Sequence, residues 1–196
     1  MAEIMEALVK GALAPLKAII NPRQFFTYVG RSAKKYGVYF TAMFYLGAWF
    51  ASSMAASFII FFATMMSSII NLDIIGFMLS PITTISYSFL FPLIAAGLDS
   101  LLIIIPVYFA EERPPLHTVL AVRASSLLPY TLRVVLLAIT GHLTLRALVS
   151  ASTTLYSLAL LLAGTALTYY GLVKTGVPRK NSAIGALLPL LYKLVL

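Results

Sequence analysis

The stretch YGVYFTAMFYLGAWFASSMAASFIIFFATMMSSIINL, from Tyr36 to Leu72, holds 37 residues without one charged side chain. A transmembrane helix needs about 20 predominantly apolar residues, because that length crosses the hydrocarbon core of a bilayer. A helix on the surface of a water-soluble domain turns part of its circumference to solvent and carries polar or charged residues there. The stretch therefore predicts a helix embedded in a membrane.

Two further uncharged stretches, Ile74–Leu98 and Ala147–Val173, repeat this pattern. Over the whole chain 61% of the residues are hydrophobic and 10% are charged, against about 45–50% and about 25% in an average soluble domain. We expect an all-α fold, a polytopic transmembrane helical bundle of about five spans that is preceded by amphipathic interfacial helices. The expected spans are residues 38–65, 81–110, 116–140, 150–172 and 182–196.

The last expected span is short. Its 15 residues rise about 22 Å as a helix, less than the roughly 30 Å of the hydrocarbon core. It either crosses a thinned bilayer, with Lys193 extended toward the interface, or enters and leaves on one side. Four spans are therefore the alternative to five.

Residues 1–37 form the predicted cytoplasmic and interfacial part, and residues 38–196 form the transmembrane domain. Asn21-Pro22 is a typical helix start, with Asn as the N-cap and Pro at the first position. In the helix that follows, Phe25 and Phe26 belong to an apolar face. The opposite face carries the basic residues Arg23, Arg31, Lys34 and Lys35. Such a helix suits the surface of an anionic leaflet, although a basic flank that only sets the topology explains the same pattern.

The distribution of positive charge predicts the orientation. With the N-terminus inside, the expected inner side holds ten Lys and Arg residues, and the outer side holds Arg146 and Lys193. Positive residues accumulate in cytoplasmic loops, so we expect a multi-pass protein of the cell membrane with a cytoplasmic N-terminus and an outer C-terminus. Because the charges flank apolar spans, the net charge of +8 indicates anionic lipid as the partner and not nucleic acid.

Three charged residues fall inside the expected second and third spans: Asp99, Arg123 and Arg133. An isolated charge at this depth costs about 2.5–3.5 kcal/mol on insertion scales. We therefore expect Asp99 to form an intramembrane ion pair with one or both arginines. The pair is either a structural contact that sets the helix register or part of a substrate or proton site.

The sequence predicts no enzyme, no cofactor and no metal site. Cysteine is absent, which excludes thiol nucleophiles and thiolate ligands. Glu111, Glu112 and His117 share one expected inner loop, but Pro114-Pro115 separates them and the spacing is not typical of metal ligands. We interpret this loop as a solvated turn, and His142 is expected on the opposite side of the membrane. Sequence motifs of hydrolases, zinc proteases and phosphate-binding loops are also absent.

Two segments resemble the Yip1 family of small multi-pass membrane proteins. INPRQFF (Ile20–Phe26) resembles the P-x-x-F-F entry that precedes the first span in that family, and TVLAVRASSLLP (Thr118–Pro129) resembles its third-span pattern. The resemblance covers roughly residues 21–196 and is closest to prokaryotic-type members, without the long soluble N-terminal region of eukaryotic ones. It implies a cytoplasmic N-terminus followed by five clustered hydrophobic segments, in a non-enzymatic protein that acts through partner proteins or lipid organisation.

Two functions remain open from the sequence. The first is a membrane-organising or trafficking-like adaptor that acts through lipids, a membrane-protein partner or a second copy of itself. The alternative is a small oligomeric transporter or channel with Asp99 and Arg133 in its pathway. A transporter requires a solvated route to Asp99, whereas an adaptor can bury its ionic groups in a closed bundle.

Overall fold

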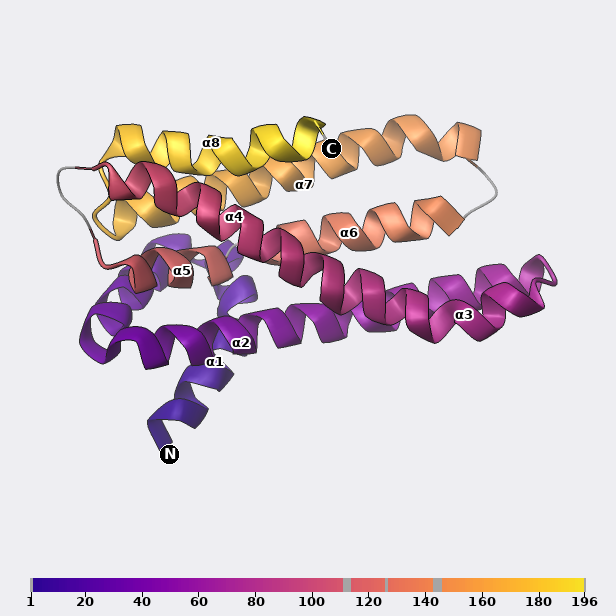
Figure 1. The fold of residues 1–196 in the computed structure, drawn as a ribbon, viewed down its shortest axis with the longest axis horizontal. Coiled ribbons are helices and arrows are strands. Elements are labelled where there is room, and N and C mark those ends of the chain that lie inside the picture. Colours follow the sequence, from indigo (N-terminus) through magenta and orange to yellow (C-terminus); the bar gives the residue numbers. More distant parts are fainter. Residues whose placement is uncertain (1, 111–113, 126, 143–145, 196) are drawn as a thin grey trace.

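The computed structural model describes residues 2–110, 114–125, 127–142 and 146–195. Every regular element in these ranges is helical (Figure 1), in agreement with the predicted all-α class. The elements are α1 (Ala2–Ile20), α2 (Pro22–Ile70), α3 (Ile74–Ile85), a π-helical turn (Ser86–Leu90), α4 (Phe91–Tyr108), α5 (Leu116–Ser125), α6 (Leu127–His142), α7 (Arg146–Lys174) and α8 (Arg179–Val195). Most of them run along the long axis of the molecule, and α1 crosses α2 at one end.

Two of the described helices are long and apolar enough to cross a membrane, namely α2 and residues 154–174 of α7. A third crossing results if α5 and α6, which are bent by 45°, act as one span. The other apolar residues lie in shorter helices at 74–90 and 96–108, and α8 has 17 residues, which rise about 26 Å. The described helices thus support a membrane protein with two or three candidate spans, and five spans are not confirmed.

The turn between α2 and α3 is tighter than the sequence indicated. Helix α2 continues to Ile70, beyond the expected end at residue 65, and α3 begins at Ile74, ahead of the expected start at residue 81. Leu72 has a positive φ of 53°, and the Asp73 carboxylate accepts a hydrogen bond of 2.9 Å from the Gly76 N–H. Because this side-chain cap starts the new helix at once, the two helices pack together without a long loop.

Helix α2 is broken at Gly37, whose φ of 70° and ψ of −148° are not helical. Glycine adopts this backbone conformation without the steric penalty that a Cβ atom brings. The break separates the amphipathic part of α2, residues 22–36, from its long apolar part, residues 38–70. The two parts therefore take different directions, with the bend at the end of the molecule where α1 lies (Figure 1).

Two glycines let α1 lie directly on the apolar part of α2. A Cβ atom added to Gly11 would lie 2.2 Å from the Phe44 carbonyl oxygen, and one added to Gly47 would lie 2.3 Å from the Leu8 carbonyl oxygen. Both distances are far below van der Waals contact, so only glycine permits this crossing. The buried face of α1 also carries small residues, namely Ala7, Ala14 and Ala18. Its large apolar side chains point outward and are exposed, namely Ile4, Met5, Val9, Leu13, Leu16, Ile19 and Ile20.

Candidate functional site: a buried ionic cluster and an exposed basic face

Asp99 lies in α4 at the centre of an ionic cluster, and none of its surface is exposed. Arg123, at the end of α5 and 1% exposed, donates from Nη2 to Asp99 Oδ2. The structure thus brings together the first pair that the sequence singled out. Because each ion would be costly to bury alone, the contact ties α5 to α4 inside the apolar bundle.

Lys193 of α8 is the second cation on Asp99, and its Nζ also donates to Oδ2. The Lys193 side chain is 8% exposed, whereas the sequence placed it at the outer interface. Helix α8 reaches this position by packing along α4, and at its other end the Asn181 Nδ2 donates to the Pro106 carbonyl at 2.7 Å. Sequence reasoning missed this contact, although a lone lysine within a short apolar segment is itself a signal that a buried partner exists.

Arg133, the second arginine that the sequence offered as a partner of Asp99, contacts α7 and α8. Its Nε donates to the Ser157 hydroxyl of α7 at 2.9 Å, and its Nη2 lies 3.5 Å from the Lys193 carbonyl oxygen. In the described part of the chain, Asp99 forms its ion pairs with Arg123 and Lys193. Arg133 lies in α6, and its contacts join this helix to α7 and α8.

An aromatic ring accompanies the two cations. The Arg123 guanidinium carbon lies 4.1 Å from the centroid of the Tyr130 ring, and the Lys193 Nζ lies 3.6 Å from it. The electron-rich face of an aromatic ring attracts cations, most strongly where water is excluded. Two cations share one carboxylate here, a formal excess of one positive charge that the ring face stabilises.

Glu111 and Glu112 lie outside the described residues, as does the side chain of His142. His117 lies in α5 and is half-buried, and its carbonyl oxygen accepts from the Thr41 hydroxyl at 3.2 Å. Within the described part of the chain, no group of three His, Cys, Asp or Glu residues could hold a metal ion.

The basic residues predicted to contact anionic lipid, Arg23, Arg31, Lys34 and Lys35, are all exposed. The apolar face of the same helix is buried within the protein, whereas an interfacial helix would turn this face to lipid. Phe26 is 0% exposed and its ring lies 6.1 Å from the ring of Tyr170, while Phe25 stacks on Phe44 at 6.3 Å. Since α1, α5 and α7 all pack against α2, these helices cover the apolar face that an interfacial helix would turn to lipid.

Exposed apolar surface at this end includes the large side chains of α1, which point outward. The N-terminal region therefore combines an exposed basic face on α2 with an exposed apolar face on α1. This combination has the chemistry of a membrane interface, where cations meet head groups and apolar side chains meet acyl chains.

The chain was compared with protein-family models, with curated proteins and with solved structures, and none of them matches it.

Proposed function

We propose that the chain is a non-enzymatic integral membrane protein of Yip1 type, which organises the membrane or acts as an adaptor through lipids and partner proteins. The proposal places it in the cell membrane with a cytoplasmic N-terminus and an outer C-terminus. The chain then crosses five times if α3 and α4 together form one span and α8 forms the last. Its support is the division of the molecule into a bundle closed by buried charges and an N-terminal region with exposed basic and apolar surfaces.

The observation that carries the proposal is the burial of Asp99. A transporter or channel needs a solvated path to its polar groups within the membrane, and the Asp99 carboxylate has no exposed surface. Its Oδ2 instead holds Arg123 of α5 and Lys193 of α8 against α4. Such an arrangement stabilises a closed bundle, as expected for a protein that acts through its surface.

Cysteine labelling tests the closed bundle, because the chain has no natural cysteine. Ser100 is 8% exposed, lies next to Asp99 in α4, and differs from cysteine by one atom. We expect Ser100→Cys to resist a membrane-impermeant maleimide from both sides of intact and opened vesicles. Lys34→Cys is the exposed control and reacts from the inner side. Labelling of Ser100→Cys at a rate within about tenfold of the control would favour the solvated path of a transporter.

Lipid selectivity tests the membrane-organising part. Trp49 is the single tryptophan of the chain and is a fluorescence donor to dansyl-labelled lipid in reconstituted vesicles. We expect more transfer to labelled phosphatidylglycerol than to labelled phosphatidylcholine, because the basic face attracts anionic head groups by about 1 kcal/mol per charge. Neutralising Arg23, Arg31, Lys34 and Lys35 together removes the difference. An unchanged preference in that variant would contradict the role of this face.

A further inference from the structure

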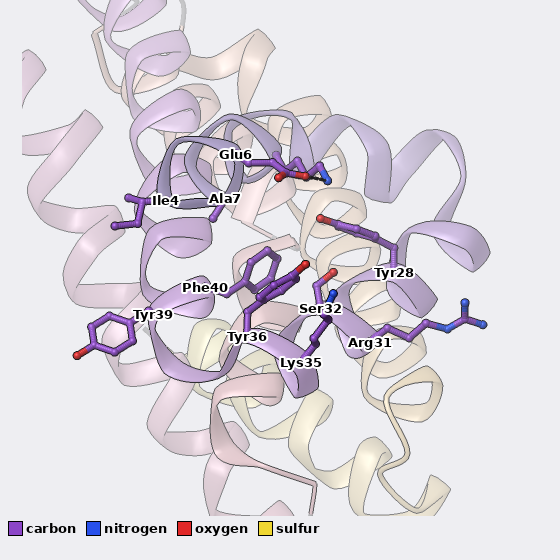
Figure 2. A pocket seen from close by; sticks show the side chains of 11 residues that line it. Ile4, Glu6, Ala7, Tyr28, Arg31, Ser32, Lys35, Tyr36, Tyr39 and Phe40 are labelled. Atoms are coloured by element: carbon purple, nitrogen blue, oxygen red, sulfur yellow. Dashed lines mark hydrogen bonds and ion pairs between the residues drawn. The ribbon is translucent and has the colours of Figure 1, made fainter. Parts of the chain in front are cut away.

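A groove of about 460 Å³ lies between α1 and the part of α2 on either side of the Gly37 break. Its lining includes three cations, Lys10, Arg31 and Lys35, and one carboxylate, Glu6. The lining therefore carries a net charge of +2, from three positive groups and one negative group. Tyrosine rings and hydroxyl groups supply the rest of its polar surface (Figure 2).

The polar groups of the groove converge on one region. Figure 2 shows the Tyr28 hydroxyl, the Ser32 hydroxyl and the Lys35 side chain directed toward the middle of the groove, with Arg31 directed outward at the rim. The Lys10 Nζ is held by Glu6 and lies 4.9 Å from the centroid of the Tyr28 ring. The Lys35 Nζ lies 4.7 Å from the centroid of the Tyr36 ring. Two ammonium groups and two hydroxyl donors thus face a common space from two helices.

The side chains that hold Lys10 also keep it charged. Hydrogen bonding to the Glu6 carboxylate raises the pKa of Lys10 above its usual range, and the neighbouring Tyr28 acts in the same direction. Lysine is ordinarily protonated at neutral pH. Lys10 therefore remains a cation at the wall of the groove and can donate to an anion.

The position of the groove relative to α1 indicates the depth at which it lies. Helix α1 crosses α2 at Gly47, and the groove lies on the side of residues 28–40. On the other flank of α1, a second hollow of about 390 Å³ is lined by apolar side chains that include Val9, Leu46 and Phe50. The surroundings change from basic to apolar across one helix, as the bilayer changes from head groups to acyl chains.

We propose that this groove binds the phosphate head group of an anionic glycerophospholipid from the leaflet in which α1 lies. Lys10 and Lys35 pair with the phosphate oxygens, and the hydroxyls of Tyr28 and Ser32 donate hydrogen bonds to them. The acyl chains extend past Ile4, which is 46% exposed at the rim. The inference rests on the proposed function and adds to it a single defined site, in place of a general attraction to the basic face.

Native mass spectrometry of the full chain in maltoside micelles tests the site, with dioleoylphosphatidylglycerol and dioleoylphosphatidylcholine as the two probes. We expect the anionic lipid to bind more tightly than the zwitterionic one. Lys35→Gln weakens the binding of the anionic lipid by about tenfold, as expected for the loss of one charge-assisted contact. Lys17→Gln is the matched control, because Lys17 is an exposed lysine of α1 that neither lines the groove nor belongs to the basic face of α2, and it changes binding by less than about twofold.

Equal losses in the two variants would overturn the groove site, while the general attraction of the basic face to anionic lipid would stand. Competition by millimolar glycerol 1-phosphate at the strength of the intact lipid would also overturn the proposal, because the ligand would then be a soluble phosphate ester. Loss of binding in Tyr28→Phe, with the fold unchanged by circular dichroism, would support it. The labelling of Ser100→Cys reports on the closed bundle separately, so failure of the site and failure of the proposed function give different results.

Discussion

The charges around Asp99 predict opposite effects for two substitutions in the same cluster. One carboxylate is shared by two buried cations, Arg123 and Lys193. Asp99→Asn raises the formal charge of these three groups from +1 to +2 and removes the carboxylate that both cations share. Lys193→Met lowers the net charge to zero and leaves a balanced pair between Asp99 and Arg123, with a side chain of similar length in place of the lysine.

The expected magnitudes follow from the burial of these groups, which are 0–8% exposed. Removing one partner of a buried ion pair costs about 3–5 kcal/mol, whereas replacing buried ions by apolar groups is often neutral or stabilising. We therefore expect Asp99→Asn to lower the free energy of unfolding by about 3–5 kcal/mol and Lys193→Met to change it by less than about 1 kcal/mol. The double variant is more stable than Asp99→Asn alone, because it contains one unpaired cation instead of two.

Reversible unfolding in mixed micelles, followed by far-UV circular dichroism during a titration with sodium dodecyl sulfate, measures these differences. Asp73→Asn is the matched control: Asp73 is an exposed N-cap, asparagine caps equally well, and the expected change is below about 0.5 kcal/mol. A cost for Asp99→Asn as small as that of the control would refute the reasoning, since it would mean that the cluster is hydrated. If the double variant, Asp99→Asn with Lys193→Met, is less stable than Asp99→Asn alone, Lys193 does not add an unbalanced positive charge to the cluster.

Three further predictions concern the backbone and the topology. Gly47→Ala places a Cβ atom 2.3 Å from an α1 carbonyl oxygen, so we expect it to lower the free energy of unfolding by about 1–3 kcal/mol. Gly97→Ala is its control in the same sodium dodecyl sulfate titration and is tolerated, because nothing lies within 4 Å of the added Cβ atom. Gly37→Ala lowers the free energy of unfolding by about 1–3 kcal/mol through its positive φ alone, since the surroundings of Gly37 are open. An unchanged midpoint of the unfolding titration would show that the helix is not broken at this residue. Leu72→Cys, at a position 88% exposed, reacts with impermeant maleimide from outside intact cells, whereas Lys34→Cys reacts only after permeabilisation; the reverse pattern would invert the proposed topology.

Some features of the fold could be predicted from the sequence because they depend on residues close together in the chain. The length of an uncharged stretch such as Tyr36–Leu72 indicates a membrane helix without any tertiary contact. The helix start at Asn21 is equally local, and the structure shows its Oδ1 accepting from the Gln24 N–H at 3.4 Å. A charge within an apolar span likewise requires a partner, so Asp99 and Arg123 could be singled out, and the structure places them in contact.

The remainder of the site depended on helix packing. Periodicity shows that Phe25 and Phe26 share an apolar face, but not whether lipid or protein covers it, and here protein does. The same limit explains why the large apolar side chains of α1 are exposed, because the helix packs through its glycine and alanine face. The groove between α1 and α2 follows from that close crossing, so no motif in the sequence indicates it.

The sequence by itself determined that this chain is helical and built for a membrane, because hydropathy and the cost of burying charge act on each segment separately. Tertiary structure alone decided which charges meet. Lys193 and Asp99 are 94 residues apart in the chain, and Arg133 of α6 contacts Ser157 of α7. Such contacts depend on how helices cross and bend, which is determined by the packing of many side chains together and not by the pattern within any one segment.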